Sequence, residues 1–282
     1  MGLKTAPRRR KDGEFRKWSS LTLLVSLVFA GVVGGSTYLL TSQGIDPVQF
    51  YSNMANPSMR FVRVFPGMRK EEIADLYGKT FAWNEQNKTA FLNAADMETG
   101  SNVDGYYLPG NYWFSKDVGG AEAGQDMLEN FDTTIQKQVL GKKTNNLKKN
   151  INVDTAVRIA SIIQREAAGK HDMNLISGVI WNRIFLGMNL QMDATLQYAK
   201  GTTTNWWPQV KGSDKSIESP FNTYKYKGLP PTAIANPSVA AIEAAYNPTK
   251  TDCIFYIHDN NRRIHCTADY DVHKANIEKY LR

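Results

Sequence analysis

Residues 154–199 read DTAVRIASIIQREAAGKHDMNLISGVIWNRIFLGMNLQMDATLQYA and contain two sets of apolar residues at helical spacing. The first set is Ala156, Ile159, Ala160, Ile163 and Ala167, and the second is Leu175, Ile176, Val179, Ile180 and Ile184. This spacing predicts two amphipathic helices, with Asp154 as the N-cap of the first and a turn at Gly187 after the second. The stretch therefore predicts two helices that each bury one face.

Glu166 interrupts the first helical pattern. It follows Ile163 by three residues and Ile162 by four, so its carboxylate should project beside the buried face. Desolvation raises the pKa of such a group, which is the condition for a general acid that holds its proton near neutral pH. The alternative is a helix-edge glutamate paired with Arg165 or Arg183, and periodicity alone does not separate the two.

Three other carboxylates are alternatives to Glu166. Glu243 lies in the alanine-rich helix VAAIEAAYN and Glu218 lies in a loop, and both are more simply interpreted as surface residues. Asp193 is harder to dismiss because it follows the second helix directly, in the segment Leu190–Thr195.

The sequence before residue 154 predicts smaller elements. Residues 41–59 have the composition of a linker, and residues 60–65 alternate like a strand. Short helices are expected at 70–78 and about 85–95, a longer one at about 121–140, and a solvated loop at 141–150. A strand followed by two small helices is the outline of a LysM-type carbohydrate-binding module, although a generic α+β subdomain fits equally well. The aromatic segment 104–112 suits either stacking on sugar rings or ordinary packing.

The charge and hydropathy of the N-terminus predict a membrane anchor. The formal charge of +7 is concentrated in residues 1–17, which contain seven basic and two acidic residues, and the nearly neutral remainder argues against nucleic-acid binding. Residues 19–40 carry no charge, and as a helix they would span about 33 Å, enough to cross a bilayer core of roughly 30 Å. We expect a retained, single-pass signal anchor in the inner (plasma) membrane, with residues 1–18 cytoplasmic and the rest periplasmic or extracellular. A cleaved signal peptide is the alternative, but Tyr38–Thr41 lacks a small-x-small site.

The two cysteines, Cys253 and Cys266, fall in the part predicted to lie outside, where disulfides persist. They flank a hairpin pattern around the polar residues 259–261. A two-residue turn at Asp259-Asn260 would place the cysteines directly opposite one another, within disulfide reach, whereas a turn at Asn260-Asn261 would separate them. The four histidines show no metal-ligand spacing.

Five blocks carry a family resemblance: ASIIQREA at 160–167, VIWNR at 179–183, GMNLQMD at 187–193, SPFNTY at 219–224 and GLPPTAIANP at 228–237. Their order and spacing resemble those of the MltG/YceG-like endolytic murein transglycosylases, and the resemblance covers nearly the whole chain. It implies an α+β fold with a cytoplasmic segment (1–18), a transmembrane anchor (19–40), a linker (41–59), a LysM-like subdomain (60–104) and a catalytic YceG-like domain (105–282). It also implies that Glu166 is the catalytic residue.

The sequence departs from the family pattern at three places. Gln164 stands where the family commonly has a second glutamate, so a mechanism that requires that carboxylate would fail here. The usual Thr-Asp-Pro is replaced by Met192-Asp193-Ala194, which keeps only the acid. Near the end, His273-Lys274 replaces His-Asn, which weakens any functional role for the tail.

The resemblance implies cleavage of the β-1,4 bond between N-acetylmuramic acid and N-acetylglucosamine, leaving 1,6-anhydro ends, in cell wall assembly and without metal or cofactor. Amides, hydroxyls and an aromatic ring suit a saccharide, and the candidates for the glycan groove are Gln191, Asp193, Ser219, Asn222, Thr223 and Tyr224; loop capping is their alternative role. The expected partners are peptidoglycan glycan strands, the membrane and, as candidates, peptidoglycan synthases. Two rival functions remain open: a muramidase that uses Asp193 as its second carboxylate, and a non-catalytic glycan-binding scaffold.

Overall fold

A computed structural model describes residues 32–42, 45–94, 104–142 and 145–281 of the chain. The expected cytoplasmic segment 1–18 and most of the expected anchor 19–40 lie outside the described residues. No helix within the described ranges is long and apolar enough to cross a membrane. The chain divides into two compact units, residues 1–57 and 58–282.

The first unit contains helix α2 (Pro47–Ala55), which the prediction of a linker at 41–59 missed. The Asp46 carboxylate caps this helix by accepting hydrogen bonds from the amides of Val48 and Gln49, and Pro47 occupies its first turn. The local signal for a helix was therefore present, but the surrounding Gly, Asn and Ser residues obscured it.

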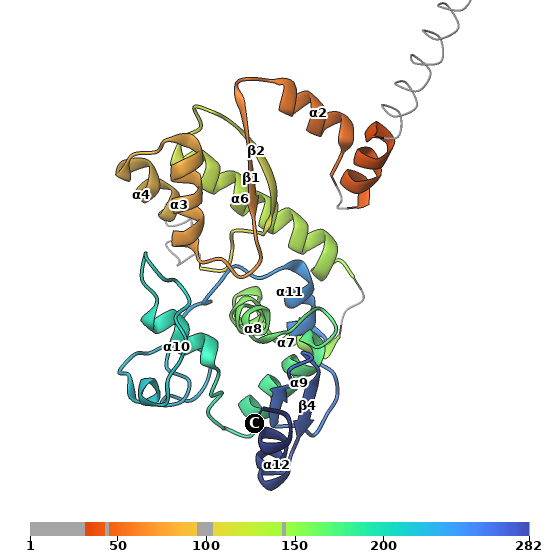
Figure 1. The fold of residues 1–282 in the computed structure, drawn as a ribbon, viewed down its shortest axis with the longest axis vertical. Helices are drawn as coiled ribbons and strands as arrows, with labels where there is room; N and C mark the ends of the chain where they lie inside the picture. The colour runs from red at the N-terminus through yellow and green to blue at the C-terminus, as the bar shows by residue number, and fades with distance from the viewer. Residues whose placement is uncertain (1–31, 43–44, 95–103, 143–144, 282) are drawn as a thin grey trace, which may run out of the picture. The chain divides into compact units, whose positions relative to one another are not determined.

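The second unit begins with a two-stranded antiparallel sheet flanked by helices (Figure 1). Strand β1 (Met59–Val64) pairs with β2 (Gly110–Ser115) from Met59 opposite Ser115 to Val64 opposite Gly110. Between them in sequence lie α3 (Lys70–Phe81) and α4 (Glu85–Leu92), and α6 (Gly120–Ile135) follows β2. The predicted strand and both short helices are confirmed, and the described elements follow in the order β1, α3, α4 and β2. The predicted boundary at 104/105 separates β1 from its partner strand, so it lies too early for this sheet.

This first part has its own aromatic core, which includes Tyr77, Phe91, Tyr107, Tyr112 and Phe114. Residues alternate between the core and the outer face of the sheet, as the strand pattern predicted. Tyr107 is fully buried, so the aromatic segment 104–112 packs inside the protein. Of the two roles left open for that segment, the structure favours packing.

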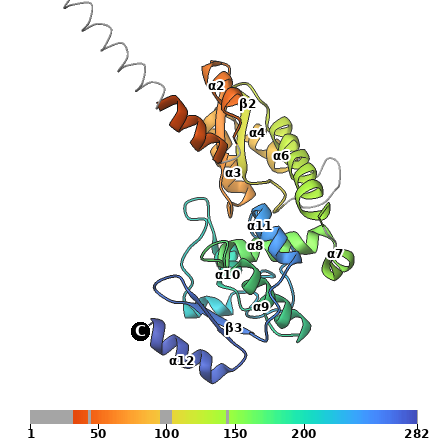
Figure 2. The same ribbon diagram turned by 90° about the vertical axis from the view of Figure 1, so that its right-hand side faces the viewer.

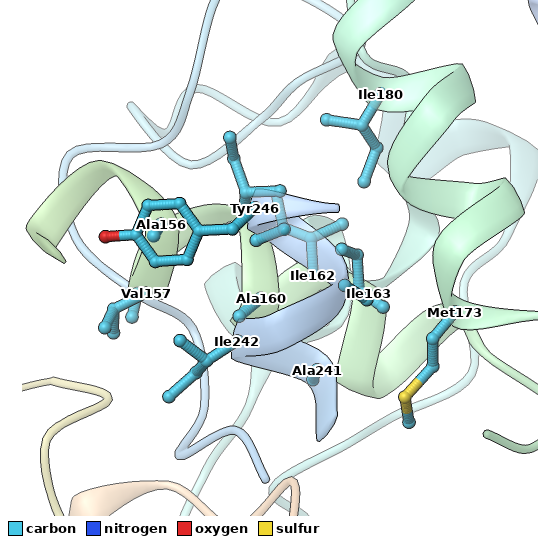
Figure 3. Packing of buried hydrophobic residues seen from close by; sticks show 14 of the residues in the cluster. Ala156, Val157, Ala160, Ile162, Ile163, Met173, Ile180, Ala241, Ile242 and Tyr246 are labelled. Atoms are coloured by element: carbon cyan, nitrogen blue, oxygen red, sulfur yellow. The ribbon is translucent and has the colours of Figure 1, made fainter. Parts of the chain in front are cut away.

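The second core is helical and is built around α8 (Val153–Glu166), which contacts α9 (Met173–Phe185), α10 (Asp193–Lys200) and α11 (Val239–Tyr246), as Figure 2 shows. In Figure 3, Ala156, Val157, Ala160 and Ile163 of α8 pack with Ile242 and Tyr246 of α11, and Ile180 of α9 lies beside them. Both predicted helices are confirmed, but only α8 keeps one buried face, because α9 is buried on most sides from Ile176 to Trp181.

Two local predictions in this region were wrong. The N-cap of α8 is Asn152, whose side-chain oxygen accepts a hydrogen bond from the Thr155 amide at 2.8 Å, whereas Asp154 pairs with Arg158. The stretch 141–150 is not only a loop, because it contains the short helix α7 (Asn146–Asn150). The helix expected at 121–140 is α6 followed by a π-helical turn, η1 (Gln136–Leu140).

The chain ends in a hairpin of β3 (Phe255–His258) and β4 (Ile264–Thr267), followed by α12 (Tyr270–Leu281). Cys253 and Cys266 form a disulfide with Cα atoms 5.6 Å apart. The register behind that prediction was wrong, since Cys266 lies opposite Tyr256 and five residues, 259–263, connect the strands. Cys253 reaches Cys266 from the segment before β3 rather than from within the ladder.

Candidate active site

Glu166 is the last residue of α8, and its carboxylate reaches the first turn of α10. Glu166 Oε1 accepts a hydrogen bond from the Ala194 amide at 3.2 Å. The N-cap of α10, Met192, has no side-chain oxygen to offer, so Glu166 satisfies an amide at a helix start that would otherwise need a partner. The carboxylate therefore joins the end of one helix to the beginning of another.

Tyr256 of β3 holds the other carboxylate oxygen. Its hydroxyl donates to Glu166 Oε2 at 2.8 Å and lies 3.5 Å from the sulfur of Met192. Tyr256 is not among the predicted site residues, because its only local signal is a short strand pattern 90 residues beyond Glu166. The contact depends on how the terminal hairpin folds back onto α8.

The environment of Glu166 suits a group that exchanges a proton. Burial raises its pKa above the ordinary value, the nearby charge of Asp193 acts in the same direction, and the hydrogen bonds from Tyr256 and Ala194 oppose the shift. The predicted direction is thus confirmed. The residue as a whole is half-buried, although burial is the main cause of the raised pKa of its carboxyl group.

Neither arginine considered as a partner of Glu166 forms an ion pair with it. The guanidinium of Arg165 lies over the ring of Trp207, 3.7 Å from the ring centre. Arg183 is buried and donates to the carbonyls of Ile254 at 2.6 Å and Leu190 at 2.7 Å. The ion pair considered for Glu166 is therefore not formed with either arginine, and Arg183 instead fixes the backbone on both sides of the site.

The loop after Glu166 is fixed by the buried carboxylate of Asp172. This group accepts hydrogen bonds from the amides of Ala168 at 2.9 Å and Gly169 at 3.1 Å, and it pairs with His258 Nε2 at 2.7 Å. Burial alone would raise the pKa of Asp172, but these hydrogen bonds outweigh burial and lower it. His258 and Tyr256 lie on the same strand, so β3 holds both Glu166 and the loop behind it.

Three of the six predicted saccharide contacts lie around Glu166. Asp193 and Gln191 are exposed on either side of Met192, and the Tyr224 hydroxyl donates to Asp193 Oδ1 at 2.6 Å. Gln191 has a positive φ of 53° and its side-chain oxygen accepts from Arg183 Nη1 at 3.3 Å. The loop containing Tyr224 and the loop before α10 therefore meet beside the carboxylate.

The other three residues have mainly internal partners. Asn222 is fully buried and donates to the carbonyls of Lys215 and Ile217, while Thr223 Oγ1 accepts from the Met192 amide at 3.0 Å. Ser219 Oγ accepts from the Phe221 amide and also lines an open pocket of about 470 Å³ with Glu218, Pro220 and Tyr226. Asn222 and Thr223 thus shape the loop, which agrees with the loop-capping role considered for them. Contact between any of the six residues and a saccharide stays a prediction.

The sequence model of the YceG-like family matches residues 18–279. This chain belongs to the YceG-like family. It is 27% identical to an endolytic murein transglycosylase of Bacillus subtilis over 270 residues, which are 94% of this chain and 71% of that protein. It is 28% identical to an endolytic murein transglycosylase of Streptococcus pneumoniae serotype 2 over 193 residues, which are 67% of this chain and 34% of that protein. The chain thus spans about a third of the length of the pneumococcal relative.

The YceG-like fold is also shared with a solved structure. A yceG-like protein from Listeria monocytogenes superposes with a TM-score of 0.66 at 24% sequence identity, covering 80% of this chain and 79% of that one. At this level of identity, the likeness establishes the common fold alone.

The places where this YceG-like chain departs from the family pattern have structural roles here. Gln164 Oε1 accepts from the amide of Ser238 at 3.1 Å and from its hydroxyl at 2.7 Å, so it joins α8 to the N-cap of α11. At the last departure, Lys274 pairs with Asp271 at 2.8 Å within α12, while the preceding His273, which follows the pattern, stacks on Phe255 with ring centres 5.1 Å apart. Among the described residues, no group of three His, Cys, Asp or Glu side chains could hold a metal ion.

Proposed function

We propose that this YceG-like chain is an endolytic peptidoglycan transglycosylase in which Glu166 is the only catalytic acid and base. The observation that carries the proposal is the placement of Glu166. Burial raises the pKa of its carboxyl group, and each of the two oxygens accepts a hydrogen bond from one donor. Two relatives named endolytic murein transglycosylase support the same reaction.

The proposed reaction needs one proton carrier and no water. Protonated Glu166 gives its proton to the β-1,4 oxygen, the bond from that oxygen to C1 of N-acetylmuramic acid breaks, and the N-acetylglucosamine leaves with a 4-hydroxyl. The C6 hydroxyl oxygen of the same muramyl residue then bonds to C1, and its proton returns to Glu166. The nucleophile belongs to the substrate, so its effective concentration is high.

The surroundings of Glu166 match both halves of this cycle. Burial favours the protonated acid before cleavage. After the proton has left, the Ala194 amide and the Tyr256 hydroxyl donate to the resulting carboxylate. A single residue can therefore act as the acid and then as the base.

A muramidase remains the rival reaction, and Asp193 would be its second carboxylate. The exposed Asp193 accepts a hydrogen bond from Tyr224, which suits a residue that binds sugar hydroxyls as much as one that activates water. We therefore propose that four side chains contact the glycan: Asp193, Gln191, Tyr224 and Ser219. Asn222 and Thr223 would instead hold the loop in the shape that places Tyr224 beside Asp193.

We further propose that the LysM-like subdomain expected at residues 60–104, extended to include β2, binds the same strand. Its support is the antiparallel pairing of β1 and β2 around two short helices. Residues 19–40 would anchor the protein in the plasma membrane, on the basis of their uncharged sequence and the basic segment before them. Peptidoglycan synthases are candidate partners at that location.

Mass spectrometry of digested glycan strands tests the proposed reaction. We expect internal cleavage products with 1,6-anhydro-N-acetylmuramic acid ends, and Asp193→Asn should weaken activity while leaving those ends unchanged. Products with reducing ends, together with loss of activity in Asp193→Asn, would favour the muramidase. Binding without any cleavage would favour the scaffold.

A further inference from the structure

One side chain from the terminal hairpin contacts the proposed catalytic group directly. The Tyr256 hydroxyl lies 2.8 Å from Glu166 Oε2, which is the shorter of the two hydrogen bonds that the carboxylate accepts. The ring reaches α8 from β3. Another residue of this strand, His258, pairs with Asp172 in the loop after Glu166. The reaction described above needs a donor to the carboxylate but does not require it to be a tyrosine, so the choice of this side chain calls for a separate explanation.

We propose that Tyr256 is the positioning residue of the catalytic cycle: its hydroxyl orients the Glu166 carboxyl group and stabilises the carboxylate formed when the proton leaves. This inference rests on the proposed function, because the cycle it describes is that of Glu166 as both acid and base. It adds a residue that acts through Glu166 and does not itself contact the reacting sugar.

The chemistry of a phenol suits this role better than that of a charged donor. A lysine or arginine at this distance would hold Glu166 ionised and prevent it from acting as an acid. A neutral hydroxyl gives a weaker stabilisation and can also accept a hydrogen bond when Glu166 is protonated. Burial and the charge of Glu166 raise the pKa of Tyr256 well above its usual value, so the hydroxyl stays protonated throughout.

The hairpin is built to keep Tyr256 in place. Arg183 Nε donates to the carbonyl of Ile254, two residues before Tyr256, at 2.6 Å. His258, two residues after it, pairs with the buried Asp172 at 2.7 Å. The disulfide joins Cys253 to Cys266, and Cys266 lies opposite Tyr256 in the ladder. The tyrosine is thus fixed on both sides along the strand and across it.

Tyr256→Phe removes the hydroxyl and keeps the ring. A hydrogen bond to a charged group contributes enough that its loss should lower kcat by roughly 10- to 100-fold. The pKa of Glu166 should rise, because the hydrogen bond that lowers it is gone. The alkaline limb of the pH–rate profile should therefore move to higher pH, which a change in stability alone would not produce.

Tyr112→Phe is the matched control. Tyr112 is also buried, and its hydroxyl donates to a backbone carbonyl, that of Leu108, in the separate aromatic core. This variant should lose some stability and keep the position of the alkaline limb. A Tyr256→Phe enzyme with an unmoved alkaline limb and a kcat within twofold of the unmodified enzyme would overturn the proposal.

A measurement that does not need activity separates this inference from the proposed function. The carboxyl carbon of Glu166 can be followed by 13C NMR during a pH titration, with its signal assigned by its absence in Glu166→Gln. We expect the Glu166 pKa to be higher in Tyr256→Phe than in the unmodified protein. An equal or lower pKa would overturn the positioning role whether or not the protein cleaves glycan, whereas a raised pKa in a protein without activity would refute only the proposed reaction.

Discussion

Glu166 lies between two helix ends that act on its carboxyl group in opposite directions. The C-terminal end of α8 carries partial negative charge and disfavours the carboxylate, while the first turn of α10 carries partial positive charge and favours it. Burial adds to the first effect, and the hydrogen bonds from Ala194 and Tyr256 add to the second. A residue that acts first as an acid and then as a base needs such a balance, because neither the protonated carboxyl group nor the carboxylate can be too strongly stabilised.

The raised pKa of Glu166 predicts how stability depends on pH. A carboxyl group whose pKa is higher in the folded state binds more protons there, so folding loses stability as pH rises from the unfolded value of about 4.3 through the folded pKa. Glu166→Gln lacks this loss. We therefore expect the free energy of unfolding of the variant, minus that of the unmodified protein, to increase between pH 4 and pH 8, as measured by urea denaturation. A difference that stays constant or reverses over this range would contradict the raised pKa.

At the level of residues, the sequence could predict what depends on local spacing. The burial of Glu166 followed from its distance to Ile162 and Ile163, which are fully buried. Tyr256 could not be predicted, because its contact depends on a fold-back of the chain that no spacing encodes. Asn222 and Thr223 lie close to the site but have buried internal partners, and residue type alone could not separate these two roles.

The β3–β4 hairpin shows how a single side chain changes the register of an element. Asp259 Oδ1 accepts from the amides of Asn261 at 2.8 Å and Arg263 at 2.9 Å, and Arg262 adopts a φ of 62°. These interactions stabilise a five-residue connection where a two-residue turn was considered. The hairpin and the cysteine pair could be predicted from the sequence. Their register could not, because it depends on the hydrogen bonds that the Asp259 carboxylate accepts within the connection.

The disulfide should stabilise this hairpin. Joining residues that are 13 positions apart typically contributes about 2–4 kcal/mol. We expect a Cys253→Ser and Cys266→Ser double variant to unfold at a lower temperature in a thermal scan than the oxidised protein. Reductant should lower the Tm of the unmodified protein and leave that of the double variant unchanged. Two reactive thiols in the natively purified, non-reduced protein would contradict the bond itself.

At the scale of the whole chain, helices were predicted more successfully than boundaries. The apolar faces of α8 and α9 form within the sequence stretch that contains them, so pattern was sufficient. The first sheet instead pairs strands more than 40 residues apart, from Met59–Val64 to Gly110–Ser115, and a division at 104/105 could not anticipate this. Tyr112 and Phe114 of β2 pack in the same aromatic core as residues of β1, α3 and α4, which precede it in the sequence.

Membrane topology is the prediction that concerns the N-terminal part of the chain. Because basic residues precede the uncharged stretch 19–40, the N-terminus should face the cytoplasm and the second unit should lie outside. A reporter that is active only outside the membrane, fused after Arg282, should be active, and one that is active only in the cytoplasm should not. The reverse pattern would place the enzyme on the wrong side for its proposed substrate.

The most direct test of the central claim is the cleavage rate of Glu166→Gln on glycan strands, measured by mass spectrometry of anhydro-ended products. Loss of general acid–base catalysis typically lowers a rate by about 10²–10⁴-fold. Glu166 would serve two proton transfers, so we expect a loss at or beyond the upper end of that range in a protein that still folds. Glu243→Gln, which changes a glutamate of α11 paired with Lys142, is the control and should keep its activity. A well-folded Glu166→Gln protein that forms anhydro ends at the rate of the unmodified enzyme would contradict the account.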